Sequence, residues 1–232
     1  MHNNQAAQDI ARETIHDLHG FIQVGMSEKT IAEKCRQLME AKGSNGWWYH
    51  GLPALVLLGS RSTLSISGRH YQPLEDHRVS ATDIVTIDLS PTVDGWWGDY
   101  ARAIFIEDGV VAEEDRPRTP LFRQGLEAEL HLHARLLEIA APDMPLDTLY
   151  QVMNQEITAL GFENLDYRGN LGHTVEVHEA ERVYIERGNS ATFAQLGRAF
   201  TFEPQIRALG GHIGFKREDI YYFDAGGRLH RL

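Results

Sequence analysis

Residues 84–106 read IVTIDLSPTVDGWWGDYARAIFI, and this stretch decides the fold. Apolar residues alternate along IVTIDLS and again along ARAIFI, which is the pattern of two half-buried strands. Between them stands Asp94-Gly95, a pair typical of a tight hairpin turn. Because a hairpin folds its second strand back along its first, we expect Asp88 and Asp99 at the same end of a sheet.

These two aspartates are the strongest local indication of chemistry. Asp88 stands late in an apolar strand, where a charge is costly unless it is paired or bound to a metal. Paired hard oxygen donors suit divalent cations such as Mn or Co, and Mg less readily. The alternative for either residue is a buried aspartate that accepts hydrogen bonds from a turn.

The flanking sequence predicts two pairs of helices. Helical spacing covers residues 7–20 and then runs from an N-cap at Ser27 to near Gly43. A second pair is expected at 120–140 and 146–160. Further strand patterns occupy residues 175–185, 199–206 and 219–229. The order helix–helix–strands therefore occurs twice, which predicts one α+β domain over residues 1–232, with the charged stretch 113–119 as a weak candidate boundary.

Composition excludes several classes of protein. With 232 residues and 42% apolar content, the chain can bury a sizeable core. Its net charge of -11 argues against nucleic acid as the main partner. The single cysteine, Cys35, excludes an internal disulfide and is interpreted as packing. We expect a cytoplasmic protein, since we find neither a signal peptide nor an apolar run near the about 20 residues that span a bilayer.

Three further segments carry candidate ligands at the beginning or end of a strand pattern. GHTVEVHE contains His173 and His178, whose odd spacing would point them to opposite faces of one strand. Glu203 lies on an apolar strand directly before a proline, which ends the strand's ladder. Glu218 stands at the entrance of another strand in GFKREDIYYF. Each has an ordinary alternative, as a polar strand residue, an exposed edge glutamate or a charged turn.

The order Asp, Asp, His, Glu, Glu in these contexts resembles the pita-bread metallopeptidase family. That family comprises methionine aminopeptidases, aminopeptidase P, prolidase and the related creatinase. The matching segments are IDLSPTVDGWWGDYAR, GHTVEVHE, FTFEP and KREDIYYF, while GMSEKTIAEKCRQ is similar to the family's opening helix. The resemblance implies two pseudo-symmetric helix–helix–strand halves around a curved antiparallel sheet. The sequences of the segments GRHYQP, DGWWGDYAR and KREDIYYF are most similar to those of the prolidase-like members.

The resemblance also implies a role for each of the five residues. Asp88 would bind one of two divalent metal ions through both oxygens, and Asp99 and Glu218 would bridge the two ions. His173 and Glu203 would complete the other ion's shell. A bridging water would become a hydroxide that attacks the substrate carbonyl, and Glu203 would pass the proton to the leaving nitrogen. Such ligands admit Mn, Co, Fe or Zn.

Substrate contacts are implied for two histidines and considered for one tryptophan. His70, in SISGRHYQP, matches a histidine that lines the family's substrate side, although His50 competes for that role. His178 would be the family's second histidine, which contacts the substrate carbonyl. The two histidines are two residues closer together than in the family's GHGIG-x-x-x-HE. Either a bulge or loop is deleted here, or His178 is not the equivalent of the family's second histidine. Trp97, beside Asp99, would wall a substrate pocket, unless it faces the core.

These features predict a dinuclear metal-dependent hydrolase, an aminopeptidase or Xaa-Pro peptidase that acts on short peptides. The first predicted helix starts at residue 7, so we expect no separate N-terminal domain of the kind that prolidase has. A small non-peptide metabolite is the alternative substrate, because a fold does not fix a reaction. A non-enzymatic binding module is a more remote alternative. No membrane partner is expected, and a homodimer is the general default for soluble enzymes.

Overall fold

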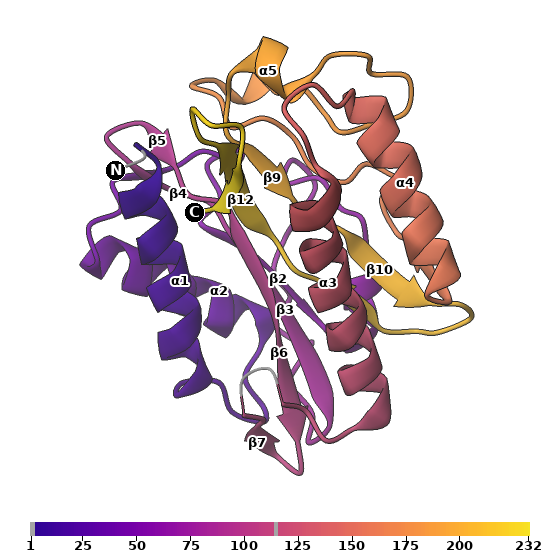
Figure 1. Ribbon diagram of the computed structural model, residues 1–232. Coiled ribbons are helices and arrows are strands. Elements are labelled where there is room, and N and C mark those ends of the chain that lie inside the picture. The colour runs from indigo at the N-terminus through magenta and orange to yellow at the C-terminus, as the bar shows by residue number, and fades with distance from the viewer. Residues whose placement is uncertain (1–2, 114–115) are drawn as a thin grey trace.

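A computed structural model describes residues 3–113 and 116–232 of the protein (Figure 1). The first half has helices α1 (Gln5–His19) and α2 (Glu28–Ala41), and the second half has α3 (Pro120–Ile139) and α4 (Leu146–Ala159). The other elements of the first half are β1 (Gly46–Trp47), β2 (Ala54–Leu58), the 3-10 helix η1 (Gly59–Thr63), β3 (Asp83–Leu89), β4 (Pro91–Val93), β5 (Trp96–Trp97), β6 (Tyr100–Glu107) and β7 (Val110–Val111). Those of the second half are β8 (Phe162–Asn164), η2 (Glu179–Glu181), α5 (Phe193–Leu196), β9 (Phe200–Phe202), β10 (Gln205–Ala208), β11 (Gly214–Lys216), β12 (Asp219–Phe223) and β13 (Leu229–Arg231). Two helices followed by strands thus occur twice, as predicted for an α+β domain with two similar halves.

The predicted hairpin is present and sets the register of the largest sheet. This sheet has the strand order β2-β3-β6-β7, and its neighbouring strands are antiparallel. Leu89 of β3 lies opposite Tyr100 of β6, so Asp88 and Asp99 stand at the same end of the two strands. The intervening residues form the small β4–β5 hairpin. At its tip Asp94-Gly95 has φ angles of 52° and 82°, and a type I′ turn requires positive φ at both positions.

Each half buries its own apolar core between its helix pair and its strands. In Figure 1, α1 and α3 lie in front of the strands. In the first half, Val56 and Leu58 of β2 pack with α1 and α2, in a cluster that also buries Cys35 completely. Leu55 and Leu57 alternate with them and face a cavity on the other side of the sheet. The helices therefore cover one face of the strands and leave the opposite face to the cavity.

The two half-sheets meet at one antiparallel bridge, which we call the seam. It pairs Ala101 of β6 with Glu218, the residue between β11 and β12. The Glu218 N–H donates to the Ala101 carbonyl at 3.0 Å, and the Ala101 N–H donates to the Glu218 carbonyl at 3.4 Å. The seam thus joins strands that are more than a hundred residues apart in the chain.

The prediction of a strand over residues 175–185 was wrong. This segment is a loop that contains η2 and turns back on residues 171–174. Thr174 N donates to the Val183 carbonyl at 2.9 Å, and Ile185 N donates to the Gly172 carbonyl at 2.8 Å. Val177 is 66% exposed, so the alternating apolar residues of this segment do not share one buried face. Alternation without a common buried face does not specify a strand.

Two other predictions concern the chain as a whole. None of the helices in residues 3–113 and 116–232 combines the length and hydropathy that a bilayer span requires. Within the charged connection 113–119, residues 114 and 115 lie outside the described part of the chain.

One buried carboxylate of α3 is left without a hydrogen bond. Both oxygens of Glu129 lack a hydrogen-bond partner among the described residues, and the residue is 2% exposed. Burial raises the pKa of Glu129 well above its ordinary value, against the opposing effect of Arg217, Lys216 and Arg102. A buried acid of this kind lowers the stability of the fold when it is ionised.

Replacing this acid by its amide should therefore stabilise the protein. Because the pKa of Glu129 is raised in the folded state, its penalty is absent at low pH, grows as the pH rises above the ordinary carboxyl pKa, and is complete once the pH exceeds the folded pKa. We expect Glu129→Gln to raise the free energy of unfolding by about 1 kcal/mol or more at pH 8, and by less at pH 5. Urea denaturation at the two pH values measures this difference. Glu127→Gln, two residues earlier and 69% exposed, is the control and should change little. An equal gain for both variants would contradict the interpretation.

Candidate metal centre

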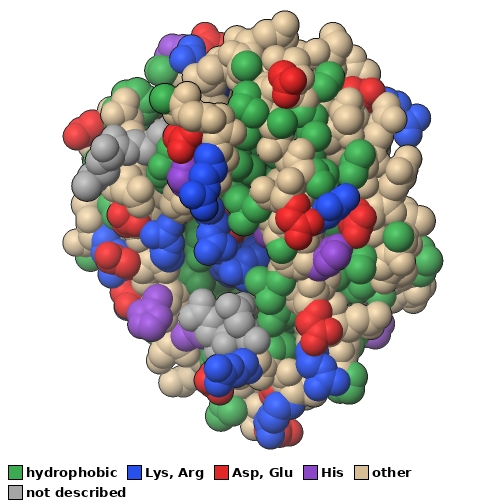
Figure 2. Space-filling view, viewed as in Figure 1, with side chains coloured by type: hydrophobic (Ala, Val, Ile, Leu, Met, Phe, Trp, Pro, Cys, Tyr) green, Lys and Arg blue, Asp and Glu red, His purple; other side chains and the backbone are tan. Residues whose placement is uncertain are grey.

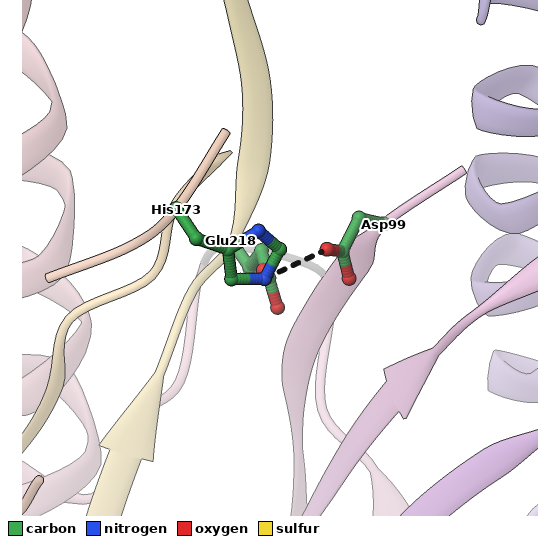
Figure 3. A group of neighbouring side chains, drawn as sticks. All are labelled: Asp99, His173 and Glu218. Carbon is green, nitrogen blue, oxygen red and sulfur yellow. Dashed lines mark ion pairs between the residues drawn. The ribbon is translucent and has the colours of Figure 1, made fainter. Parts of the chain in front are cut away.

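Three buried side chains converge at the seam (Figure 3). Asp99 directly precedes β6, His173 lies in the loop after Gly172, and Glu218 lies at the junction of β11 and β12. One donor atom of each lies within 4.8 Å of the others. His173 Nε2 lies 3.7 Å from Asp99 Oδ2. The first half of the chain therefore supplies one donor of this trio, and the second half supplies two.

The other two predicted ligands line the same cavity. Glu203 Oε1 is 3.7 Å from His173 Nε2. Asp88 reaches the group through Lys216, whose Nζ lies 2.6 Å from Asp88 Oδ2, 3.0 Å from Glu203 Oε2 and 3.2 Å from Glu218 Oε2. The cavity has a volume of about 550 Å³ and lies on the face of the strands opposite the helices. All five residues thus gather on its floor and wall.

Local structure fixes the backbone of two of these residues. Gln8 of α1 is fully buried, and its side-chain amide accepts from Asp99 N at 2.8 Å and donates to Asp99 O at 3.0 Å. Gly172 has a φ of 145° and lies against the carbonyl of Thr201, where a Cβ atom would collide. The Thr201 N–H donates to the His173 carbonyl at 2.7 Å. A side chain at position 172 would separate these segments and move His173.

The carboxylates of the centre repel one another. Burial raises the pKa of both Asp99 and Glu218 well above their ordinary values, and neighbouring carboxylates raise it further. Burial also raises the pKa of Asp88, although Lys216 opposes this. The metal-free cluster therefore holds more negative charge than its surroundings offset.

The pKa values of Glu203 and His173 are lowered, unlike those of the other three residues. Burial would raise the pKa of Glu203, but Lys216 and His173 outweigh it and lower the pKa overall. Burial lowers the pKa of His173 to about 4, so its imidazole is neutral at pH 7. Because His173 Nδ1 donates to the Thr174 carbonyl at 3.0 Å, the lone pair on Nε2 is directed at the cluster. Neutral imidazole with a defined lone pair is the form that binds metals.

This set of donors fits divalent cations. Asp99 Oδ2 and both carboxylate oxygens of Glu218 are buried and lack a hydrogen-bond partner among the described residues. Lys216 Nζ is within ion-pair distance of Glu218, but it offsets one charge of four. Metal coordination would satisfy these oxygens and supply positive charge, and a carboxylate-rich site with one imidazole admits Mn, Fe, Co or Zn.

The residues predicted to contact substrate are placed differently from one another. His70 and His50 both line the cavity, and His50 Nε2 is 3.1 Å from Glu179 Oε1. His178 is exposed and is not among the residues that line the cavity. Trp97 is 2% exposed and packs in a small core, where it stacks on Trp48 with ring centroids 4.3 Å apart. Trp48, rather than Trp97, lines the cavity.

Two charged residues of the site were missed from the sequence. Lys216 is two residues from Glu218, and the period of a strand would have indicated that both face the cavity. Arg182 had no such signal, because it lies in the loop that was predicted as a strand. Its NH1 is 3.4 Å from His173 Nε2, and its guanidinium packs over the rings of Trp48 and Tyr184.

Comparison with known proteins gives one family and several relatives. The model of metallopeptidase family M24 matches residues 2–225. An uncharacterized peptidase of Schizosaccharomyces pombe is 24% identical over 209 residues, which are 88% of this chain and 42% of that protein. A methionine aminopeptidase of Chlamydia trachomatis is 32% identical over 133 residues, 57% of this chain and 42% of that protein. The chain thus spans less than half the length of these two relatives.

The fold is also that of a solved structure. The X-Pro aminopeptidase of Thermotoga maritima superimposes with a TM-score of 0.80 at 22% identity, over 98% of this chain and 59% of that one. At this identity the likeness shows a shared fold, which agrees with the predicted pita-bread architecture.

Removing one charge from the cluster should have opposite effects on the metal-free and metal-loaded protein. We expect Asp99→Asn to raise the free energy of unfolding of the metal-free protein by about 1 kcal/mol, because it relieves repulsion among buried carboxylates. The same variant should lose the rise in melting temperature that Mn²⁺ gives the wild type. Thermal unfolding with and without Mn²⁺ measures both effects. Asp76→Asn, at an exposed position, should behave as wild type. A full Mn²⁺ effect in Asp99→Asn would exclude Asp99 as a ligand.

Proposed function

We propose that this chain, which belongs to metallopeptidase family M24, hydrolyses a peptide bond near a free N-terminus with two divalent metal ions held by the five clustered residues. The observation that carries the proposal is the convergence of Asp99, His173 and Glu218, with unsatisfied carboxylate oxygens, on the floor of a cavity. Few arrangements other than cation binding make such a cluster stable.

Each residue has a distinct place in the proposed centre. As the family resemblance implies, Asp99 and Glu218 would bridge the two ions. Asp88 would hold one ion, and His173 and Glu203 would hold the other. When bound, the metals supply Lewis acidity and lower the pKa of water in the cavity.

Glu203 is the residue proposed to move the proton. It lies on the cavity wall with its side chain 20% exposed, and its lowered pKa keeps it ionised at pH 7. An ionised carboxylate at this position can accept a proton from the attacking water and deliver it to the leaving nitrogen. β9 ends at Phe202, and the Glu203 N–H that follows donates to the Leu171 carbonyl at 2.9 Å, which fixes the backbone from which the carboxylate projects.

Arg182 supports a substrate with a free carboxylate close to the cleaved bond. Its guanidinium is held at the cavity wall by the Glu179 carbonyl at 3.0 Å and by the aromatic rings beneath it. The fork geometry of a guanidinium matches a carboxylate. Because Arg182 is this close to His173, a substrate that reaches both is short. We therefore propose dipeptides or tripeptides, including those of the Xaa-Pro class. A small carboxylate-bearing metabolite is the alternative that the same geometry allows.

A panel of substrates tests this assignment. With Mn²⁺ supplied, we expect turnover of Gly-Pro or Ala-Pro-Ala, and Arg182→Gln should raise KM for Gly-Pro about ten-fold or more by removing a charged hydrogen bond. Gly-Pro amide, which lacks the carboxylate, should be turned over poorly and equally by both proteins. Arg187→Gln, exposed and outside the cavity lining, is the matched control. Turnover of Met-Ala-Ser alone would favour a methionine aminopeptidase, and no turnover of any peptide would favour the metabolite.

The number of metal ions can be measured independently of any substrate. Lys216 Nζ lies among Asp88, Glu203 and Glu218, where it competes with one of the two proposed ions. We expect wild type to bind two Mn²⁺ ions with unequal affinities in calorimetric titration, and Lys216→Met to tighten the weaker one.

Lys42→Met is the matched control, because Lys42 also pairs with two carboxylates, Asp17 at 2.9 Å and Glu13 at 3.4 Å, but far from the cavity. A single ion in both wild type and Lys216→Met would show that the centre is mononuclear. Weaker binding in Lys216→Met would show instead that the ammonium positions Asp88.

A further inference from the structure

We propose that Arg102 is a positioning residue for the metal centre, and that it acts by fixing the seam that sets the distance between Asp99 and Glu218. The inference rests on the proposed function, because the two carboxylates are the ones assigned to bridge the metal ions. Arg102 itself touches neither the metal ligands' side chains nor the cavity.

Different contacts hold the backbones of Asp99 and Glu218 in place. Asp99 is already held by Gln8, whose side chain bonds both of its backbone groups. Glu218 belongs to the other half-sheet, and its backbone joins the first half-sheet through the pairing with Ala101. One of the two bonds of that pairing is long, at 3.4 Å.

Arg102 bonds both sides of the seam with one guanidinium. Its NH1 donates to the Ala101 carbonyl at 2.8 Å and to the Glu218 carbonyl at 2.8 Å. Its NH2 donates to Asp219 Oδ1 at 2.8 Å, and Asp219 is the residue after Glu218. The guanidinium therefore connects the backbone beside Asp99 to the backbone of Glu218 and to the next side chain.

The side chain of Arg102 lies on the face of the strands opposite the metal centre. Asp99 and Glu218 line the main cavity, whereas Arg102 lines a smaller hollow with His19 of α1 and Glu129 of α3. Figure 2 shows Lys and Arg side chains gathered around a hollow in the middle of this helix-covered face. Because successive residues of a strand point to opposite faces, the side chains of Arg102 and Asp219 can affect the metal centre only through the backbone.

The guanidinium is itself held in one orientation. It lies over the ring of Tyr100 at 3.8 Å from the ring centroid, and its side chain is 9% exposed. Asp219 is 2% exposed, and its second oxygen lies 3.8 Å from His133 Nδ1 and 3.9 Å from Arg231 NH1. A lysine could keep the charge beside Asp219, but it lacks the planar fork that reaches both carbonyls.

This arrangement has a consequence for metal affinity. Asp99 and Glu218 repel each other before metal binds. If the backbone pairing at the seam were less rigid, the two carboxylates would move apart. Residues that orient ligands from outside the coordination shell typically change metal affinity by about 10- to 100-fold when they are replaced. Arg102 should therefore affect metal binding without contacting either ligand's carboxylate.

The test compares Arg102→Lys with Arg231→Lys. Both variants keep a positive charge near Asp219, but Arg231 is 52% exposed and forms no hydrogen bond to the seam within the described residues. We expect Arg102→Lys to weaken Mn²⁺ binding about ten-fold or more in calorimetric titration, with an unchanged circular dichroism spectrum. Arg231→Lys should bind Mn²⁺ within two-fold of wild type, on the order expected for a change at an exposed position. At saturating Mn²⁺, the electron paramagnetic resonance signal of two coupled ions should be lost or altered only in Arg102→Lys.

Each result decides the matter. Wild-type affinity and an unchanged coupled signal in folded Arg102→Lys would overturn the inference and leave the proposed function intact. Absence of Mn²⁺ binding in wild type would overturn the proposed function together with the inference. If Arg102→Lys does not fold, Asp219→Asn replaces it, since this variant removes the anchor of the guanidinium and should weaken Mn²⁺ binding in the same direction. An unaffected Asp219→Asn would then overturn the inference.

Discussion

The backbone pairing of Ala101 with Glu218 brings together two half-sheets that each have their own helices and their own core. Asp99 stands two residues before this pairing on one side, and Glu218 belongs to it on the other. The distances from Asp99 to His173 and Glu218 therefore depend on how the halves meet. Gln8 and Arg102 are buried polar residues whose side chains bond the backbone on either side of this pairing. The hydrogen bonds that they form there offset the cost of desolvating them.

The centre itself lowers the stability of the metal-free fold. Four carboxylates share one wall of a cavity, and the charges that oppose them there are chiefly Lys216 and Arg182. Neither cation reaches Asp99 Oδ2, which remains without a hydrogen bond among the described residues. Unsatisfied charge of this kind is retained in proteins where a ligand needs it. The apolar cores on the helix side supply the stability that the cavity side does not.

The sequence predicted most of the fold because its signals were local. The alternation around Asp94-Gly95 specified the hairpin, and Ser27 specified the start of α2, where its side chain accepts from Thr30 N at 3.1 Å. The segment 175–185 could not be predicted in this way, since it turns back on residues 171–174 through hydrogen bonds such as Ile185 N to the Gly172 carbonyl, and its alternating apolar residues share no buried face. Among the five candidate ligands, Asp88 and Asp99 were predicted from the hairpin, whereas His173, Glu203 and Glu218 were predicted through their order and the family resemblance. The roles of Gln8, Arg102 and Arg182 depend on contacts across the chain that no local pattern records.

The division of the donors between the halves has a consequence for the cohesion of the molecule. An ion that bridges Asp99 and Glu218 would act as a cross-link between two separately cored units, and it would stabilise only the state in which they are assembled. The free energy gained would grow with the logarithm of the free metal concentration. Metal supply would then control how often the halves separate, and with it the exposure of the seam to proteases. In such a protein the cofactor governs the lifetime of the chain as well as its chemistry.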